Sequence, residues 1–477
     1  MKPAHPSRRQ ILRLGAKFAA VAAGGAAFSA CQILPSPNRR QTRDINVRDY
    51  GAVGDGVTAD TAALQKAIDA AAAVAGGARV VVPGGRRYLT AALQLRDRVE
   101  LHLADDAELL ASPNLQDYPA ALSLLSATGA AGVRLSGTGR VNGQWRQFAT
   151  NYDEPNEWWR MAARRPRLCL FTACPGLEVV DVTLGDSSNW TLHLLGCEHA
   201  LVDHVTIRNP LDVPNCDGVD LDHCRDVEVR RCDITCGDDA VVIKTSRQAT
   251  DYGPSANIQV HDCVLNTQDS GLKIGTETTR DIHDIRFEHC DIRSSCRGLC
   301  IQLRDEANVS NVRFSDINFL ARYHSDPWWG RGEAISFTAL PRTPQTMPGS
   351  ISDIRVKNVT GQAENSIRLQ GAPGNPVRNV AFENVAVTFD RWTKYPGGVF
   401  DNRPMTAPAG IEKHPTPGFN FRQADGISLN RCRVNWGRNV PEYFSNALEA
   451  ESTTHLSLTD FTGEAAHPTR DAAVKIT

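Results

Sequence analysis

Short stretches of alternating apolar and polar residues recur along most of this chain, mostly 23 to 31 residues apart. A unit of this size cannot bury its apolar face alone, but stacked units enclose a continuous core. The spacing therefore predicts an all-β fold, a right-handed single-stranded parallel β-helix. Leucine-rich repeats have a similar period, but their Leu-x-x-Leu-x-Leu pattern is missing here. The stretches begin at Val133, Leu177, Leu201, Val227, Ile258, Ile285, Val312, Ile354, Val380, Ile427 and Leu456.

Interruptions of this repeat predict the parts that are added to the coils. Residues from Thr61 to Val74 place Ala and Leu at helical spacing, which predicts one amphipathic α-helix. We expect this helix to cap the first coil, where an open core would otherwise meet water. The long gaps from 314 to 354 and from 382 to 427 predict loops inserted on the coils.

The cysteines follow the repeat. Cys232, Cys263 and Cys290 each stand five residues after the start of a similar stretch. Equivalent positions in successive coils cannot all pair with one another, so we expect a ladder of small buried thiols. The sequence leaves open one or two disulfides among the other cysteines. The chain has no Cys-x-x-Cys pair and its histidines are scattered, which argues against a zinc site.

The first 31 residues predict a targeting segment. Ser7-Arg8-Arg9-Gln10-Ile11-Leu12 resembles a twin-arginine export motif, and the apolar run at 15–30 is too short to span a bilayer. Phe28-Ser29-Ala30-Cys31 resembles a bacterial lipobox, which predicts a lipid anchor at Cys31; a plain secretory leader is the alternative.

The chain then divides into a signal at 1–31, a linker at 32–44 and a parallel β-helix domain at 45–477. The linker has two prolines and several polar residues without periodicity. Such a leader indicates an exported protein that is periplasmic or anchored to the outer membrane of a Gram-negative-type bacterium.

Charge excludes one class of partner. The formal net charge is −2, but the first thirty residues carry five basic and no acidic residues. The remainder therefore holds 47 of the 52 basic residues against all 54 acidic ones. A chain with this balance offers no basic surface for nucleic acid. We expect a monomer.

Three aspartates predict the chemistry. Asp217 and Asp238 are 21 residues apart, about one coil, so Asp217 should lie beside Asp238 and Asp239 on the adjacent coil, about 4.8 Å away along the axis. Carboxylates this close cannot all ionise, so one should hold a proton while the others stay charged. One acid and one base are what hydrolysis of a glycosidic bond requires. Both Asp238 and Asp239 can face one groove if Gly237 lets the backbone bend. Asp220 and Asp222 alternate with apolar residues, so we expect them to face outward.

The chain resembles glycoside hydrolase family 28, the polygalacturonases, over roughly residues 45 to 460. Its opening, Asn46 to Gly56, resembles that of pectin-lyase-like β-helix proteins. The resemblance implies that Asp238 is the general acid, that Asp217 and Asp239 hold the water, that the anomeric configuration is inverted and that no metal or cofactor takes part. The motifs that carry it, in the family's order, are Gly137-Thr138-Gly139-Arg140-Val141-Asn142-Gly143, Ser188-Asn189-Trp190-Thr191-Leu192-His193, Asn215-Cys216-Asp217-Gly218-Val219-Asp220 and Gly237-Asp238-Asp239.

The chain departs from this family at two motifs. Ser270 stands where the family has the His of Gly-His-Gly, and Cys300 with Gln302 stand where it has the Arg and Lys of Arg-Ile-Lys. A thiol and an amide cannot replace two cations that grip a galacturonate carboxylate. Either other cations supply that charge, or the sugar at the cleavage site is not galacturonate. The candidate cations on neighbouring turns are Lys244, Lys273, Arg297 and Arg304.

Further residues are candidates for substrate binding. Trp158-Trp159 and Trp328-Trp329 fall in stretches without strand periodicity, where indole rings could wall a sugar site; we single out Trp159 and Trp329. Loops that close a groove would favour attack at chain ends or on short branched oligosaccharides. His193, from the second family motif, and Glu333, in the loop after Trp329, are candidate polar contacts.

Three functions remain open from the sequence. The leading one is a glycoside hydrolase acting on a pectin-type or related acidic or branched glycan. A pectate-lyase-like enzyme would share the fold but would use calcium-bound carboxylates and a basic residue for β-elimination. A non-catalytic glycan-binding β-helix is the third, because the His, Arg and Lys of the family motifs are missing.

Overall fold

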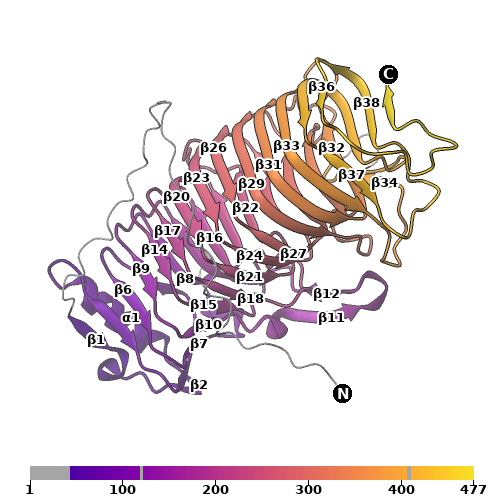
Figure 1. The fold of residues 1–477 in the computed structure, drawn as a ribbon. Helices are drawn as coiled ribbons and strands as arrows, with labels where there is room; N and C mark the ends of the chain where they lie inside the picture. The colour runs from indigo at the N-terminus through magenta and orange to yellow at the C-terminus, as the bar shows by residue number, and fades with distance from the viewer. Residues whose placement is uncertain (1–42, 119–121, 406–409) are drawn as a thin grey trace, which may run out of the picture. The chain divides into compact units, whose positions relative to one another are not determined.

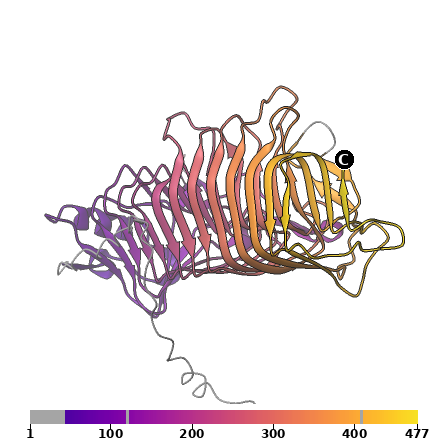
Figure 2. The same cartoon turned by 45° about the horizontal axis from the view of Figure 1, so that its top comes forward.

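The computed structural model describes residues 43–118, 122–405 and 410–477. The predicted signal and lipid-anchor site, and the predicted linker up to residue 42, lie outside the described residues. The described strands form one sheet of 36 strands, paired in parallel, and two short antiparallel pairs. The sheet winds as a right-handed parallel β-helix, which confirms the predicted fold. Figures 1 and 2 show its coils stacked in chain order. None of the helices in the described residues is both long and apolar enough to cross a membrane.

Each coil contributes to three parallel faces, here called faces 1, 2 and 3. Face 1 is formed by β5 (Leu93–Gln94), β8 (Ser123–Thr128), β13 (Arg167–Thr172), β16 (Leu192–Leu195), β19 (Val219–Asp222), β22 (Val241–Thr245), β25 (Ser270–Thr278), β28 (Arg297–Leu303), β30 (Glu333–Ala339), β32 (Asn365–Gln370), β36 (Phe419–Asn430), β38 (Leu448–Thr454) and β40 (Val474–Ile476).

Face 2 is formed by β1 (Asp44–Asn46), β3 (Arg79–Val82), β6 (Glu100–Leu103), β9 (Arg134–Ser136), β14 (Glu178–Val180), β17 (Leu201–Asp203), β20 (Arg225–Arg230), β23 (Ser255–His261), β26 (Ile282–Glu288), β29 (Val309–Ala321), β31 (Ile351–Ala363), β33 (Val377–Phe389) and β39 (Ser457–Thr459), with the second half of β36.

Face 3 is formed by β2 (Asp55–Ala59), β4 (Arg86–Thr90), β7 (Ala107–Ala111), β10 (Arg140–Asn142), β15 (Thr183–Gly185), β18 (Thr206–Arg208), β21 (Asp233–Cys236), β24 (Val264–Thr267), β27 (Asp291–Ser295) and β37 (Arg433–Trp436), with the second halves of β29, β31 and β33.

The predicted repeats are the strands of face 2. Val229, Val260 and Phe287 occupy one register position in β20, β23 and β26, and all three are fully buried. The predicted start at Leu201 is wrong by one residue, because Leu201 pairs with Glu178 and the inward side chain is Val202. Alternation in a three-residue strand is too short to fix its phase.

The cysteine ladder is confirmed. Cys232, Cys263 and Cys290 are all buried, on consecutive coils. None of the twelve cysteines in the described residues forms a disulfide, and all twelve are buried.

The predicted cap is also present. Helix α1 (Thr61–Ala72) buries Leu64, Ala67, Ile68 and Ala71 against the first coil. It contacts β1, β3 and β5, so it closes the N-terminal end of the core. The other helical segments of the described residues are single 3₁₀ turns at Val47–Tyr50, Leu115–Asp117, Trp145–Phe148 and Glu154–Asn156.

The large insertions leave the coils at one corner, where the chain passes from face 3 to face 1. The first contains β11 (Ala149–Asp153) and β12 (Trp158–Met161). The second is the loop at 322–332, between β29 and β30. The third, at 390–418, contains β34 (Val399–Asp401) and β35 (Ile411–Lys413). The two predicted loop gaps contain the second and third insertions.

Candidate active site

Three aspartates meet at this corner of the β-helix. Asp217 lies just before β19, and Asp238 and Asp239 lie between β21 and β22. The pairing of Val219 with Val241 sets Asp217 beside Asp239 on neighbouring coils, and the Gly218 N–H donates to the Asp239 carbonyl at 2.8 Å. One carboxylate oxygen from each aspartate lies within 4.8 Å of the other two. The one-coil spacing therefore predicted this juxtaposition correctly.

Gly237 is required here for space. Strand β21 ends at Cys236 and β22 begins at Val241, so Asp238 and Asp239 lie on a bend and are free of strand alternation. A Cβ at Gly237 would stand 2.2 Å from the carbonyl oxygen of Val213. A side chain at this position would push the bend outward and move both carboxylates.

The aspartates line a pocket of about 320 Å³. Its floor is the outer surface of face 1, and its wall comes from the first two insertions. The pocket is lined by Trp158, Trp190, Pro214, Asn215, Asp217, Asp238, Asp239, Lys244, Asp269, Lys273, Gly275, Thr276, Glu277, Pro327, Trp328 and Trp329.

Asp269 is a fourth carboxylate in the pocket, and sequence reasoning did not select it. The pairing of Val241 with Leu272 sets Asp269 beside Asp238 on the next coil. Ser270 donates its hydroxyl to Asp269 Oδ1 at 2.8 Å. A signal for it was present in the sequence. Asp269 stands directly before Ser270, which occupies the histidine position of the family motif, so this stretch was already marked as a point where the chain departs from the family.

Asp238 has the properties of a general acid. Removal from water raises its pKa to about 8, helped by the negative charges of Asp269 and Asp239. The Asn215 N–H, which donates to Asp238 Oδ2 at 3.0 Å, opposes this shift by stabilising the ionised form. Asp238 therefore carries a proton at neutral pH.

The other two aspartates differ from each other. Asp239 Oδ2 forms an ion pair with Lys273 Nζ at 2.6 Å. For Asp217, burial and the neighbouring charges of Asp220 and Asp238 raise the pKa well above the ordinary value. Asp217 Oδ1 is buried and has no hydrogen-bond partner among the described residues, so it can accept one from a water. Asp239 is thus held by a cation, whereas Asp217 keeps an oxygen free for a water.

Burial also raises the pKa of Asp269, to about 6, with the Asp239 charge adding to it and Lys273 and Arg297 opposing it.

Two of the predicted cations reach the pocket. Lys273 pairs with Asp239, and Lys244 Nζ lies 2.8 Å from Asp220 Oδ1 and 4.0 Å from the centre of the Trp190 ring. The pKa of Lys244 is raised well above its usual value, since Asp220 and other nearby acids outweigh burial. Both lysines therefore stay charged, and both already have carboxylate partners.

The structure brings Trp329 to the pocket but not Trp159. Trp158 lines the wall instead, with its ring centre 5.5 Å from that of Trp328. Trp159 points to the other side of the β11–β12 pair and packs against Tyr152 at 5.1 Å. Adjacent residues of a strand face opposite ways, and the sequence does not tell which of two tryptophans faces the sugar.

Gln302, Arg304 and Glu333 do not line the pocket either. Each is at most 1% exposed. Gln302 donates to the Arg403 carbonyl at 3.2 Å, and Arg304 donates to the Thr338 hydroxyl and carbonyl, both at 3.0 Å. Glu333 accepts from the Arg331 N–H at 2.6 Å. Gln302 and Glu333 contact the third insertion, at Arg403 and Asp401 respectively.

His193 and Ser270 are likewise buried behind the pocket. His193 Nε2 lies 3.4 Å from Asp222 Oδ2, and its ring meets Trp190 edge to face at 4.8 Å. Asp222 also accepts from the Ser246 N–H at 2.8 Å. As expected, the side chains of Asp220 and Asp222 point away from the core, but Lys244 and His193 cover them, so both are fully buried.

Comparison with known proteins agrees with this geometry. The sequence model of glycosyl hydrolases family 28 matches residues 77–395. The chain belongs to this family. A second model, rhamnogalacturonase A/epimerase, pectate lyase-like, matches residues 44–102.

The family 28 relatives are distant. The chain is 25% identical over 374 residues to a probable polygalacturonase of Vitis vinifera, covering 71% of this chain and 73% of the relative. It is 26% identical over 387 residues to an exo-poly-alpha-D-galacturonosidase of Dickeya chrysanthemi, covering 67% and 62%. The fold is shared with the family 28 exopolygalacturonase of Yersinia enterocolitica, with a TM-score of 0.65 at 18% identity over 88% of this chain and 78% of that one.

Membership in family 28 makes this chain a glycoside hydrolase. The β-elimination and glycan-binding alternatives are not favoured.

Proposed function

We propose that this family 28 enzyme hydrolyses a glycosidic bond in a pectin-type or related acidic or branched polysaccharide or oligosaccharide, without a cofactor. The observation that carries the proposal is the carboxylate cluster. Three carboxylates approach within 4.8 Å in a pocket walled by tryptophans, and one of them, Asp238, keeps a proton up to a pH of about 8.

The cluster divides the reaction between its members. Asp238 gives its proton to the glycosidic oxygen as the bond from that oxygen to the anomeric carbon breaks. Asp239 takes a proton from a water that Asp217 orients, and the water oxygen bonds to the anomeric carbon from the opposite side. The configuration at that carbon is thereby inverted. Lys273 holds Asp239 in place through their ion pair.

The stereochemical outcome is a sharp test of this division. Inversion requires that a water bound by Asp217 and Asp239 reaches the face of the sugar opposite to Asp238. Proton NMR of the first product should show the inverted anomer, whereas a retained anomer would mean that an aspartate attacks the sugar directly.

The charge of the pocket supports a specific substrate preference. Among its described lining residues are five acidic side chains, those of Asp217, Asp238, Asp239, Asp269 and Glu277, of which Asp238 holds a proton, and two lysines that are already ion-paired. Cys300 and Gln302 are buried and supply no cation. A galacturonate carboxylate at the cleavage point would therefore meet net negative charge. The sugar there is neutral or presents its acid group elsewhere.

The proposal is tested by assaying the purified enzyme on polygalacturonate, rhamnogalacturonan and their branched oligosaccharides. New reducing ends without unsaturated uronides are expected, with polygalacturonate cleaved slowest. Two missing charge-assisted contacts at about 1.5–3 kcal/mol each correspond to roughly a hundredfold or more in kcat/KM. Fast cleavage of plain polygalacturonate would refute the preference, and no cleavage of any of these glycans would refute the function.

We further propose that the chain is exported through its twin-arginine-type leader, anchored by a lipid on Cys31 and active as a monomer in the periplasm or at the outer membrane. The basic leader and the lipobox-like Phe28-Ser29-Ala30-Cys31 support this. Cys31→Ala should move the protein from the membrane to the soluble fraction. Unchanged fractionation would favour plain secretion.

A further inference from the structure

We infer that the third insertion blocks the C-terminal side of the acid pocket, so that this enzyme removes units from chain ends and does not cut within a polymer. This inference rests on the proposed function. The blocking part, called the plug, consists of residues 399–405 and 410–414, which include β34 and β35.

The plug covers face 1 directly beyond the pocket. Gln302 of β28 donates to the Arg403 carbonyl at 3.2 Å, and Asn365 of β32 donates to the Val399 carbonyl at 2.8 Å. Arg422 of β36 donates to Glu412 Oε1 at 2.7 Å. The plug thus contacts face 1 from β28 to β36, the strands that follow the last pocket strand, β25.

Apolar packing fills the space beneath these contacts. Phe400 is fully buried, with the guanidinium carbon of Arg368 4.4 Å from its ring centre on one side and the His414 ring stacked at 4.9 Å. The outward side chains of Ser336 and Thr338 on β30 are each 1% exposed. The surface that could carry further sugar units is therefore occupied by protein.

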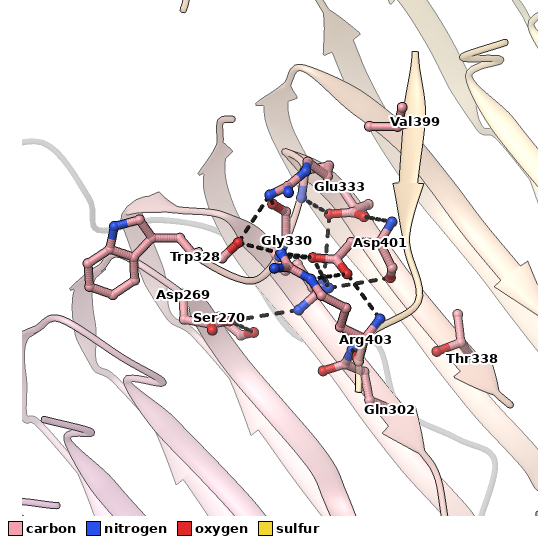
Figure 3. Close-up of polar contacts among 12 residues, drawn as sticks. Asp269, Ser270, Gln302, Trp328, Gly330, Glu333, Thr338, Val399, Asp401 and Arg403 are labelled. Atoms are coloured by element: carbon pink, nitrogen blue, oxygen red, sulfur yellow. Dashed lines mark hydrogen bonds and ion pairs between the residues drawn. The ribbon is translucent and has the colours of Figure 1, made fainter. Parts of the chain in front are cut away.

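Buried ion pairs anchor the plug to the coils. Asp401 Oδ2 lies 3.4 Å from Arg297 Nη2, accepts from the Gly330 N–H at 2.8 Å and accepts from Arg403 at 2.7 Å. Figure 3 shows Glu333, Asp401 and Arg403 gathered around Gly330 with these contacts drawn. Burial disfavours the charged form of Arg297, but the charges of Glu333 and Asp401 outweigh it and raise the Arg297 pKa, so Arg297 stays charged. Breaking one side of such a buried network is costly, which keeps the plug in place.

The other two insertions complete the barrier. Arg403 donates to the Trp328 carbonyl at 2.6 Å, which ties the plug to the aromatic wall of the pocket. Ser325 donates to the Asn156 carbonyl at 2.6 Å, and Glu157 pairs with Lys394. Segments more than 230 residues apart therefore form one continuous rim.

The pocket is consequently closed on one side. A second hollow of about 420 Å³ lies on the far side of the plug, lined by residues such as Gln370 and Met405, and it shares no described lining residue with the acid pocket. On the N-terminal side of the acids, the outward side chains of Leu170 and Thr172 on β13 remain partly exposed. A glycan can extend in that direction but not past β28.

Product analysis of the wild-type enzyme tests the inference. Oligogalacturonides and rhamnogalacturonan oligosaccharides of defined length, labelled at the reducing end, would be digested to a few per cent and separated by chromatography. The expected early products are one terminal mono- or disaccharide and the complementary shortened chain. Early internal fragments would overturn the inference while leaving the proposed function intact. No cleavage of either series would refute the proposed function itself.

A variant tests whether the plug is the cause. Phe400→Ala should loosen the plug and raise the share of internal cleavage several-fold, with terminal cleavage retained. Phe314→Ala, which removes an equally buried ring from the core of face 2, is the matched control and should keep the wild-type product pattern. An unchanged pattern in folded Phe400→Ala, or an equal change in the control, would overturn the role of the plug.

Discussion

Replacing Asp269 with asparagine should move the basic limb of the pH–activity profile to lower pH. Asp238 must be protonated to act as the acid, so activity falls as the pH rises through its pKa of about 8. The Asp269 charge is one reason for that high value, and the two residues lie on adjacent coils. Without this charge the pKa of Asp238 falls, and the proton is lost at lower pH.

The size of the shift can be estimated from the geometry. Adjacent coils are about 4.8 Å apart, and two unit charges at 5–6 Å interact by about 3 kcal/mol at an effective dielectric constant of about 20. One pKa unit is about 1.4 kcal/mol, so this is an upper value near two units. We expect a shift of about one to two pH units in the basic limb of kcat/KM.

The assay is the pH dependence of kcat/KM on whichever pectic substrate the enzyme cleaves. Asp203→Asn is the matched control, because Asp203 is a nearly buried carboxylate that pairs with Arg230 at 2.9 Å on face 2, away from the pocket. A basic limb that stays in place in Asp269→Asn would show that the charge of Asp269 does not reach the acid. Equal movement in both variants would point to a general structural effect.

Three further predictions concern the same pocket. Asp238→Asn should lower kcat by about 10²–10⁴-fold with substrate binding retained, measured by steady-state kinetics and titration calorimetry; near-full activity would disprove the acid assignment. Because the folded-state pKa of Asp238 is raised, its favourable contribution to stability is complete below pH 4 and is lost as the pH rises to about 8. As the pH rises from 4 to 8, the Tm of Asp238→Asn should therefore increase relative to that of the wild type. A Tm difference that does not change with pH would contradict the raised pKa of Asp238. Lys273→Met leaves buried Asp239 unpaired and should lower the free energy of unfolding, measured by chemical denaturation, by about 3–5 kcal/mol. Lys475→Met, which removes the exposed ion pair with Glu449, should lower it by less than about 1 kcal/mol. Equal losses in the two variants would contradict the burial argument.

The coils and the acid cluster could be predicted from the sequence because both depend on short-range spacing. Residues such as Val260 and Phe287 repeat their environment from coil to coil, and one coil brings Asp217 to Asp239. Asp269 was missed, because the family motif Gly-His-Gly has no acid at this position and only the register of the following coil brings the Asp269 carboxylate to the pocket.

The insertions could not be predicted in the same way. Arg297 lies 104 residues from Asp401, and no periodicity links a coil position to a side chain in an inserted pair of strands. Glu333 was therefore taken for a substrate contact when it is part of a buried anchor. Trp159 and Trp158 could not be told apart, because the facing of a two-stranded insertion depends on what it packs against.

The ladder of buried thiols has a consequence for how the chain must be handled. Every one of the twelve described cysteines becomes accessible when the chain unfolds, although none pairs in the folded coils. Any oxidant present during refolding would then cross-link thiols from different coils and trap the chain in wrong registers, while the native protein would be indifferent to the same oxidant. The order of events therefore matters more than the final redox conditions: the coils must stack before the chain meets an oxidising solution.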